Sequence, residues 1–128
     1  MRTSSLFCLL GLIAIFLTAC AAGTDLPART VETYLQALAD KDLNRMIAAG
    51  CGEFETQARF ELDTFAGVET RAESLACTVS NQAGETAQVT CSGAIVAAYG
   101  AEDRSFPLDG RLFNVQRQGR AWLVCGAE

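Results

Sequence analysis

A pair of cysteines placed symmetrically about a turn constrains the fold of this chain more than any other feature. Residues 72–80 and 86–98 alternate apolar and polar side chains as half-buried strands do, and residues 81–85 between them are turn-forming types. If the hairpin is centred near Gly84, Cys77 and Cys91 lie directly opposite each other and point to the same face. We therefore expect a Cys77–Cys91 disulfide across an antiparallel hairpin.

Residues 1–19 are predicted to be an export signal that is removed. Arg2 gives a positive start, and residues 6–17 form an apolar run that is too short to span a membrane. The run ends in Leu17, Thr18, Ala19 and Cys20, which resembles the lipobox of bacterial lipoproteins, whose cysteine is diacylated before cleavage. The resemblance implies that residues 20–26 are a lipidated cysteine and a short tether, and that the protein is anchored to the bacterial cell membrane or outer membrane, facing the periplasm or the surface.

The charge balance and the missing histidine narrow the possible functions. The chain has 10 basic and 15 acidic residues, and removal of Arg2 leaves 9 − 15 = −6 for the mature chain. Anionic headgroups and nucleic acids repel such a surface, so we expect membrane attachment through lipid alone and no nucleic-acid partner. The chain has no histidine, which excludes Ser-His-Asp and Cys-His catalysis and histidine-ligated metals.

The remaining cysteines predict two disulfides. Removal of Cys8 with the signal and acylation of Cys20 leave an even number in an oxidising compartment, with three possible pairings among Cys51, Cys77, Cys91 and Cys125. Because the hairpin favours Cys77–Cys91, the second bridge is expected between Cys51 and Cys125, where it ties the helical half to the last strand. The rival interpretation is a four-cysteine metal site, but the chain lacks a C-x-x-C pair, so no metal is expected.

Residues 27–65 are predicted to form three helices. Pro27 marks the first start, and apolar residues recur at helical spacing to about residue 40. Asp42 is a good cap for a short second helix, which stops at Gly50. Residues 53–65 carry an apolar stripe at helical spacing. Six nearby acids suggest a cation site, but a solvated face is the preferred interpretation for Glu53, Glu55, Glu61, Asp63, Glu69 and Glu73.

The helical period ends after Gly67, and the rest of the chain is predicted to be sheet. A third strand is expected from Ser105 to about Gln116, followed by a tight turn into a last strand over residues 121–125. Gly93 and the pair Asp109-Gly110 interrupt the alternation, where a long strand needs a bulge or a bend. Three helices followed by four antiparallel strands predict a single α+β domain over residues 27–128, with the helices on one face of the sheet.

The order of these elements resembles a known superfamily. The segment 30–38 (Thr-Val-Glu-Thr-Tyr-Leu-Gln-Ala-Leu), the helix start at Asp42-Leu43 and the closing strand Arg120-Ala121-Trp122-Leu123-Val124 look like the nuclear-transport-factor-two-like superfamily, also called cystatin-like or SnoaL-like. The likeness covers about residues 27–126. It implies a cone in which a curved four-stranded sheet and the first helices enclose an apolar cavity. This scaffold hosts isomerases, dehydratases, small-molecule binders and association modules, so the fold alone does not choose among them.

Catalysis is the least favoured of three functional hypotheses. Isomerases of the superfamily use a carboxylate and a tyrosine near the cavity, and Asp109 and Tyr34 are the candidates here. Core packing for Tyr34 and turn formation for Asp109-Gly110 are the preferred interpretations. The dehydratases use histidine, which this chain lacks. We therefore expect no enzyme and no cofactor.

Two non-catalytic hypotheses remain. One is an apolar small-molecule or lipid binder, with a cavity lined by Tyr34, Phe54, Phe65, Phe113 and Trp122. The other is an interaction module that forms a homodimer or docks an envelope protein through the open sheet face, while the same aromatics fill the cone. The second is favoured because aromatic side chains at such positions more often pack than bind a ligand.

Overall fold

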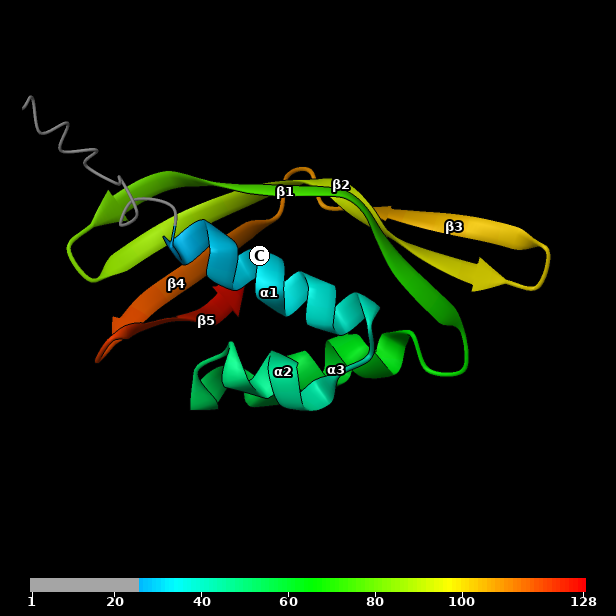
Figure 1. The fold of residues 1–128 in the computed structure, drawn as a ribbon, viewed down its shortest axis with the longest axis horizontal. Helices are drawn as coiled ribbons and strands as arrows, with labels where there is room; N and C mark the ends of the chain where they lie inside the picture. The colour runs from blue at the N-terminus through cyan, green and yellow to red at the C-terminus, as the bar shows by residue number, and fades with distance from the viewer. Residues whose placement is uncertain (1–25) are drawn as a thin grey trace, which may run out of the picture.

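The computed structural model describes residues 26–128, in which three α-helices precede a five-stranded antiparallel sheet (Figure 1). The helices are α1 (Leu26–Ala39), α2 (Leu43–Ala48) and α3 (Glu55–Thr64), with a short 3-10 helix, η1 (Gly52–Phe54), before α3. The strands are β1 (Glu69–Ala83), β2 (Thr86–Tyr99), β3 (Glu102–Pro107), β4 (Leu112–Gln118) and β5 (Ala121–Ala127). Figure 1 shows the helices on one side of the sheet, so the predicted α+β arrangement is confirmed.

The predicted signal of residues 1–19, the lipidated Cys20 and the tether as far as residue 25 lie outside the described residues. Within residues 26–128, no helix has both the length and the apolar character needed to cross a membrane.

Strand β2 pairs with three of the other four strands of the sheet. It pairs with β1 on one side, and on the other side with β4 through residues 86–90 and with β3 through residues 94–99. Strand β5 pairs with β4, which gives the order β1-β2-β4-β5 with β3 attached to β2. Because β3 and β4 follow each other along one edge of β2, this edge is occupied by two strands in succession.

The prediction of four strands, with one continuous strand from Ser105 to about Gln116, is wrong. The chain leaves the sheet after Pro107 and returns at Leu112. The Leu108 side chain is 2% exposed and lies in the core, and its N–H donates to the Gly93 carbonyl at 2.9 Å. Gly110 then turns the chain with φ +83°, a conformation that suits glycine. Burial of Leu108 and this turn together divide the expected strand into β3 and β4.

A bulge at Gly93 bends the long β1–β2 hairpin. Glu73 pairs with Ala94 and Ala76 with Ser92, so two residues of β1 face the single Gly93. Gly93 has φ +94°, and a Cβ built on it would lie 2.5 Å from the carbonyl oxygens of Glu73 and Ser74. Only glycine fits this position without displacing the backbone, and the prediction of an interruption there is confirmed.

The core lies between α1 and the sheet. Side chains from both layers are at most 2% exposed, among them Val31, Tyr34, Leu35 and Leu38 of α1 and Val89, Phe113, Val115 and Val124 of the sheet. No polar or charged residue among residues 26–128 is fully buried. Asp42 caps α2 as predicted, because its carboxylate accepts the Arg45 backbone N–H at 3.1 Å.

Both predicted disulfides are present. Cys77 is directly paired with Cys91 in the hairpin, with 4.0 Å between their Cα atoms, and Cys51 is bonded to Cys125 with 5.0 Å between Cα atoms. The long bridge lies beside a short backbone ladder, in which the Cys51 N–H donates to the Val124 carbonyl at 2.8 Å and the Val124 N–H donates to the Ala49 carbonyl at 2.9 Å. The link between α2 and η1 therefore covers part of the outer edge of β5.

Candidate functional site

The five aromatic side chains offered as the lining of one cavity lie in three different places. Tyr34, Phe54 and Phe113 are 0–2% exposed and pack in the core, where the Tyr34 and Phe54 ring centroids are 5.4 Å apart. Phe65 lines a pocket beside β3, whereas Trp122 lines a groove at the start of α1. The aromatic residues of α1, η1 and β4 therefore fill the space that an open cone would leave.

The first depression, the α3 pocket, lies between α3 and the segment that joins β3 to β4. Its volume is about 300 Å³, and it is lined by Leu38, Glu61, Thr64, Phe65, Ile95, Phe106, Pro107, Leu108 and Arg111. Phe65 and Phe106 are in edge-to-face contact in its wall, with 5.2 Å between ring centroids and an angle of 85° between planes. Apolar side chains thus form most of the wall.

A carboxylate held by two donors is the polar part of the α3 pocket. The Tyr34 hydroxyl donates to Glu61 Oε2 at 2.9 Å, and Arg111 Nη2 donates to Glu61 Oε1 at 2.7 Å. The Glu61 side chain is 16% exposed and that of Arg111 is 30% exposed, while the Arg111 guanidinium lies 4.9 Å from the centre of the Phe113 ring. Both carboxylate oxygens are thereby occupied, and the three side chains fasten α3 to α1 and to the start of β4.

Burial and this carboxylate keep the Tyr34 phenol protonated. Removal from water raises the pKa of Tyr34 well above its ordinary value of 10, the negative charge of Glu61 and the hydrogen bond to it raise the pKa further, and Arg111 lowers it. Tyr34 therefore remains protonated, and a hydrogen-bond donor to Glu61, at pH values at which an ordinary tyrosine has begun to ionise.

The shifted pKa of Tyr34 makes the folded state sensitive to alkaline pH. Because the folded pKa is raised, the contribution of Tyr34 to stability is complete below pH 10 and is lost as the pH rises above that value, where the unfolded chain releases the proton. Tyrosinate absorbance can be followed during an alkaline pH titration of the folded chain and of the urea-unfolded chain. We expect Tyr34→Phe to leave the titration curve of the folded chain unchanged, and to remove one ionisation step near pH 10 from the curve of the unfolded chain. A step lost from the folded titration would contradict this assignment.

The carboxylate next to Tyr34 is Glu61, and not Asp109, which only the isomerase hypothesis paired with Tyr34. Asp109 is exposed in the turn between β3 and β4 and is not part of the α3 pocket lining. The prediction of a solvated face is wrong for Glu61, whose side chain is 16% exposed. Glu61 lies three residues after Ala58 and four before Phe65, so it borders the apolar stripe of α3, a signal that was available in the sequence. Its partner Arg111 is distant in sequence, and no local pattern marks it.

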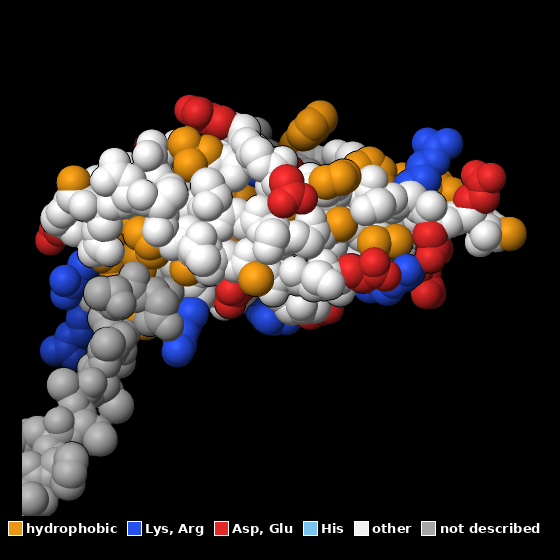
Figure 2. Space-filling view, turned by 90° about the horizontal axis from the view of Figure 1, so that it is seen from above, with side chains coloured by type: hydrophobic (Ala, Val, Ile, Leu, Met, Phe, Trp, Pro, Cys, Tyr) orange, Lys and Arg blue, Asp and Glu red, His pale blue; other side chains and the backbone are white. Residues whose placement is uncertain are grey.

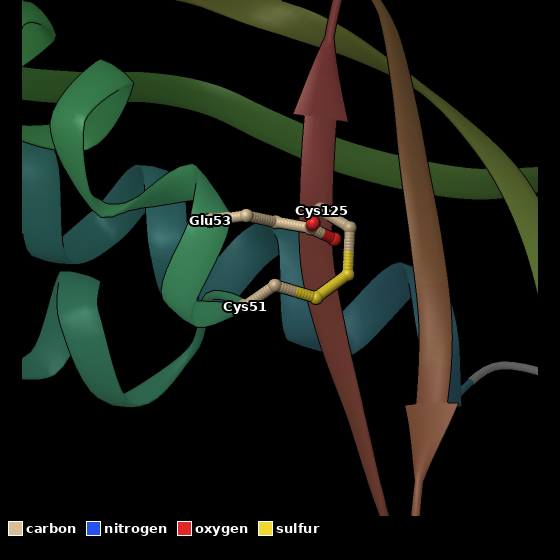
Figure 3. A group of neighbouring side chains, drawn as sticks. All are labelled: Cys51, Glu53 and Cys125. Atoms are coloured by element: carbon tan, nitrogen blue, oxygen red, sulfur yellow. A yellow bond between two sulfur atoms is a disulfide. The ribbon is translucent and has the colours of Figure 1, made fainter.

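A second group of side chains of the kinds that bind metal ions consists of the long disulfide and one neighbouring glutamate (Figure 3). Cys51, Glu53 and Cys125 bring their sulfur and carboxylate atoms within 4.8 Å of one another. Because the sulfurs are joined to each other, neither is a thiolate, and an exposed carboxylate alone does not hold a metal ion. Gln118 Nε2 donates to Cys51 Sγ at 3.3 Å, so the side chains at this point support the bridge.

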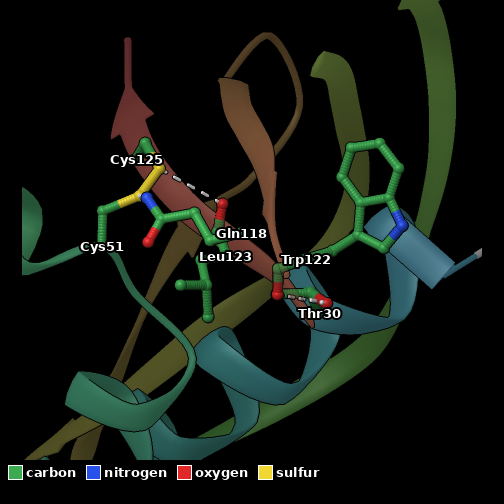
Figure 4. The surroundings of a disulfide bond; sticks show 6 residues. All are labelled: Thr30, Cys51, Gln118, Trp122, Leu123 and Cys125. Carbon is green, nitrogen blue, oxygen red and sulfur yellow. Dashed lines mark hydrogen bonds between the residues drawn. A yellow bond between two sulfur atoms is a disulfide. The ribbon is translucent and has the colours of Figure 1, made fainter. Parts of the chain in front are cut away.

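The second depression, the Trp122 groove, lies where α1 begins beside β5, and Figure 4 shows three residues of its lining, Thr30, Trp122 and Leu123. Its volume is about 370 Å³, and it is lined by Leu26, Arg29, Thr30, Thr33, Arg45, Ala48, Ala49, Arg120, Ala121, Trp122 and Leu123. The Thr30 hydroxyl donates to the Trp122 carbonyl at 3.2 Å and so joins α1 to β5 within the groove lining. Among the described residues, this lining contains three arginines and no acidic residue.

Comparison with known proteins gives a fold neighbour and no family. No family model matches the chain, and no curated protein matches it. The chain is similar to the solution structure of RPA3114, a SEC-C motif containing protein from Rhodopseudomonas palustris, with a TM-score of 0.54 and 12% identity over 80% of this chain and 79% of that one. It is also similar to Bd1075 from Bdellovibrio bacteriovorus, with a TM-score of 0.49 and 9% identity over 78% of this chain and 37% of that one. At these identities, the first likeness supports the α+β fold alone.

Proposed function

We propose that this chain is a lipid-anchored protein of the bacterial envelope and that its domain is a non-catalytic interaction module. The proposal carries forward the lipobox-like segment ending in Cys20, the two disulfides and the superfamily likeness of a curved, cone-like sheet covered by helices. Disulfides persist in oxidising compartments, which agrees with export. The absence of a free acid–base pair in the α3 pocket is the reason for choosing binding over catalysis, since Glu61 is engaged by Tyr34 and Arg111.

The observation that carries the proposal is the continuity between the α3 pocket and exposed aromatic side chains of the β2–β3 hairpin. Phe106 is paired with the buried Ile95 and so faces the pocket, yet it is 37% exposed. Tyr99 lies on the same face of β2 as Ile95 and is 39% exposed, under the guanidinium of Arg104 at 5.3 Å. Figure 1 shows this hairpin projecting beyond the helices.

An exposed aromatic strip that leads into a small apolar pocket suits a protein partner. Interfaces of this kind place one large apolar side chain in a pocket and surround it with weaker contacts. We therefore assign the α3 pocket to an apolar side chain of an envelope protein, with the touching rings of Phe65 and Phe106 as one part of its wall.

Photo-crosslinking in the native envelope tests both parts of the proposal. A benzoylphenylalanine at Thr64, an exposed residue of the pocket lining, should crosslink to one envelope protein, whereas the same probe at the exposed Thr78 of β1 should not. Phe106→Ala should reduce the crosslink about ten-fold or more, because a central aromatic anchor is lost. In the same cells a clickable palmitate should label the chain, and Cys20→Ser should remove the label.

Two outcomes would redirect the proposal. Equal crosslinking from Thr64 and Thr78 would show that the pocket is not the contact surface. A small-molecule adduct seen by native mass spectrometry, and lost in a folded Thr64→Trp variant that fills the pocket, would favour the small-ligand hypothesis. The volume of about 300 Å³ is at the lower end of the range for such cavities.

A further inference from the structure

We propose that the end of the domain at which α1 begins lies against a membrane, and that the Trp122 groove holds the phosphate of an anionic phospholipid headgroup. This proposal rests on the membrane anchoring proposed above, and it adds a second contact that the net charge of the chain does not suggest. The occupant is assigned from the charge, the side-chain types and the position of the groove.

The charge of the groove is opposite to that of the protein as a whole. The chain carries five more acidic than basic residues, yet the lining that the groove draws from residues 26–128 includes Arg29, Arg45 and Arg120 and no acidic residue. Arg45 is paired with Asp40 at 3.1 Å, whereas Arg120 makes no ion pair with any residue from 26 to 128. Figure 2 shows several Lys and Arg side chains at the end of the molecule from which the grey segment leaves, while those at the opposite end lie next to Asp and Glu side chains. A phosphate is the ligand that such a cluster recognises.

A fourth arginine extends the basic surface along the sheet. Arg117 of β4 is the direct partner of Trp122 on β5, so the two side chains lie on the same face. Arg117 is exposed, and its Nε donates to the Gly119 carbonyl at 3.1 Å within the turn that also carries Arg120. The tip of the β4–β5 hairpin is therefore basic on the side that faces the groove.

The apolar part of the groove has the composition of a membrane interface. Trp122 is the single tryptophan of the chain and is partly exposed, and Leu26 beside it is 41% exposed. Tryptophan is favoured at headgroup depth because its ring is apolar while its N–H is polar. The exposed leucine and the tryptophan suit the acyl chains of a bilayer, and the arginines around them suit the phosphates of the headgroups that lie above those chains.

The position of the groove agrees with the position of the anchor along the chain. Leu26 belongs to the groove lining and is also the first residue of α1. The covalent chain from Cys20 to Leu26 reaches at most about 20 Å. A lipid on Cys20 therefore holds the Trp122 groove close to the bilayer surface, where a headgroup is the nearest anionic group.

Vesicle binding by the unlipidated chain tests the proposal independently of the anchor. The full mature chain, residues 20–128 with Cys20→Ser, is mixed with vesicles of phosphatidylcholine alone or with phosphatidylglycerol added. We expect binding to the anionic vesicles only, a blue shift of Trp122 emission on binding, and loss of both in 0.5 M salt. Arg120→Glu should weaken partitioning on the order of 20-fold, since it changes the local charge by two units. Arg104→Glu makes the same charge change on the distant β3 and should alter partitioning less than about two-fold.

The outcomes separate this proposal from the proposed function. Equal binding to both kinds of vesicle, an unchanged Trp122 emission, or equal losses in the Arg120 and Arg104 variants would overturn the groove assignment. Binding to an acidic protein in preference to anionic vesicles would also overturn it. An absence of palmitate on Cys20 would instead contradict the lipid anchor while leaving the vesicle result intact.

Discussion

Replacing Cys51 and Cys125 together by alanine is expected to lower the free energy of unfolding by about 4.5 kcal/mol, the largest loss that we anticipate from any change in this chain. The bond joins residues 74 apart in sequence, and without it the unfolded chain regains the entropy of a loop of this length. Urea unfolding followed by circular dichroism measures the change. If the variant is unfolded without urea, titration with a protecting osmolyte locates its transition.

The short disulfide provides the matched control. Cys77 and Cys91 are 14 residues apart, so their replacement by alanine should cost about 3 kcal/mol under the same conditions. Backbone hydrogen bonds persist beside both bridges, those of the hairpin around Cys77–Cys91 and those of Ala49 and Cys51 with Val124 at the long bridge, so the difference in loop length is what the comparison measures. Equal losses in the two double variants, or a larger loss for the short bridge, would contradict the loop-entropy explanation.

Gly93→Ala is expected to destabilise the protein by about 3 kcal/mol. An alanine with φ near +94° is itself strained, and its Cβ would lie 2.5 Å from two backbone carbonyl oxygens of β1. The oxygens belong to strand backbone, so they cannot move aside as the end of a side chain would. Thermal or urea unfolding of the variant measures the loss of stability. The backbone amides of the β1–β2 hairpin should also exchange their hydrogens faster than in the parent protein.

Gly84→Ala separates the two causes of that loss. Gly84 also has a positive φ, +59°, but no atom lies within 4 Å of the position of an added Cβ. It should therefore show only the conformational cost, about 1 kcal/mol. If Gly93→Ala proves as mild as Gly84→Ala, the close approach between β1 and β2 at the bulge is not a constraint on the fold.

Local patterns predicted the parts of this fold that depend on neighbouring residues. The symmetric placement of Cys77 and Cys91 about Gly84 gave the hairpin register, and the Asp42 cap gave the start of α2. Elimination then gave the Cys51–Cys125 pair. The division of the third strand was only half visible, because Asp109-Gly110 marked a break but the burial of Leu108 depends on the core that it enters.

The candidate site was less predictable for a physical reason. Periodicity shows which side of an element is buried, and a filled core and a hollow cone produce the same pattern. Tyr34 and Phe113 are therefore equally consistent with cavity lining and with packing until the opposite layer is known. The Glu61–Arg111 ion pair joins positions 50 residues apart, and such a pairing is fixed only by the tertiary fold.

The position of β5 at the end of the chain determines the order in which the two disulfides can form. During synthesis Cys51 emerges before Cys77 and Cys91, and its partner Cys125 belongs to the last strand to emerge. The β1–β2 hairpin closes a short loop and can pair its two thiols quickly, which removes the wrong partners available to Cys51. The link between α2 and η1 then has no strand to pair with until the carboxyl end of the chain arrives. The bridge between the helical half and the sheet therefore forms only when the final residues arrive, so a chain that lacks them is left with an unpaired thiol at Cys51.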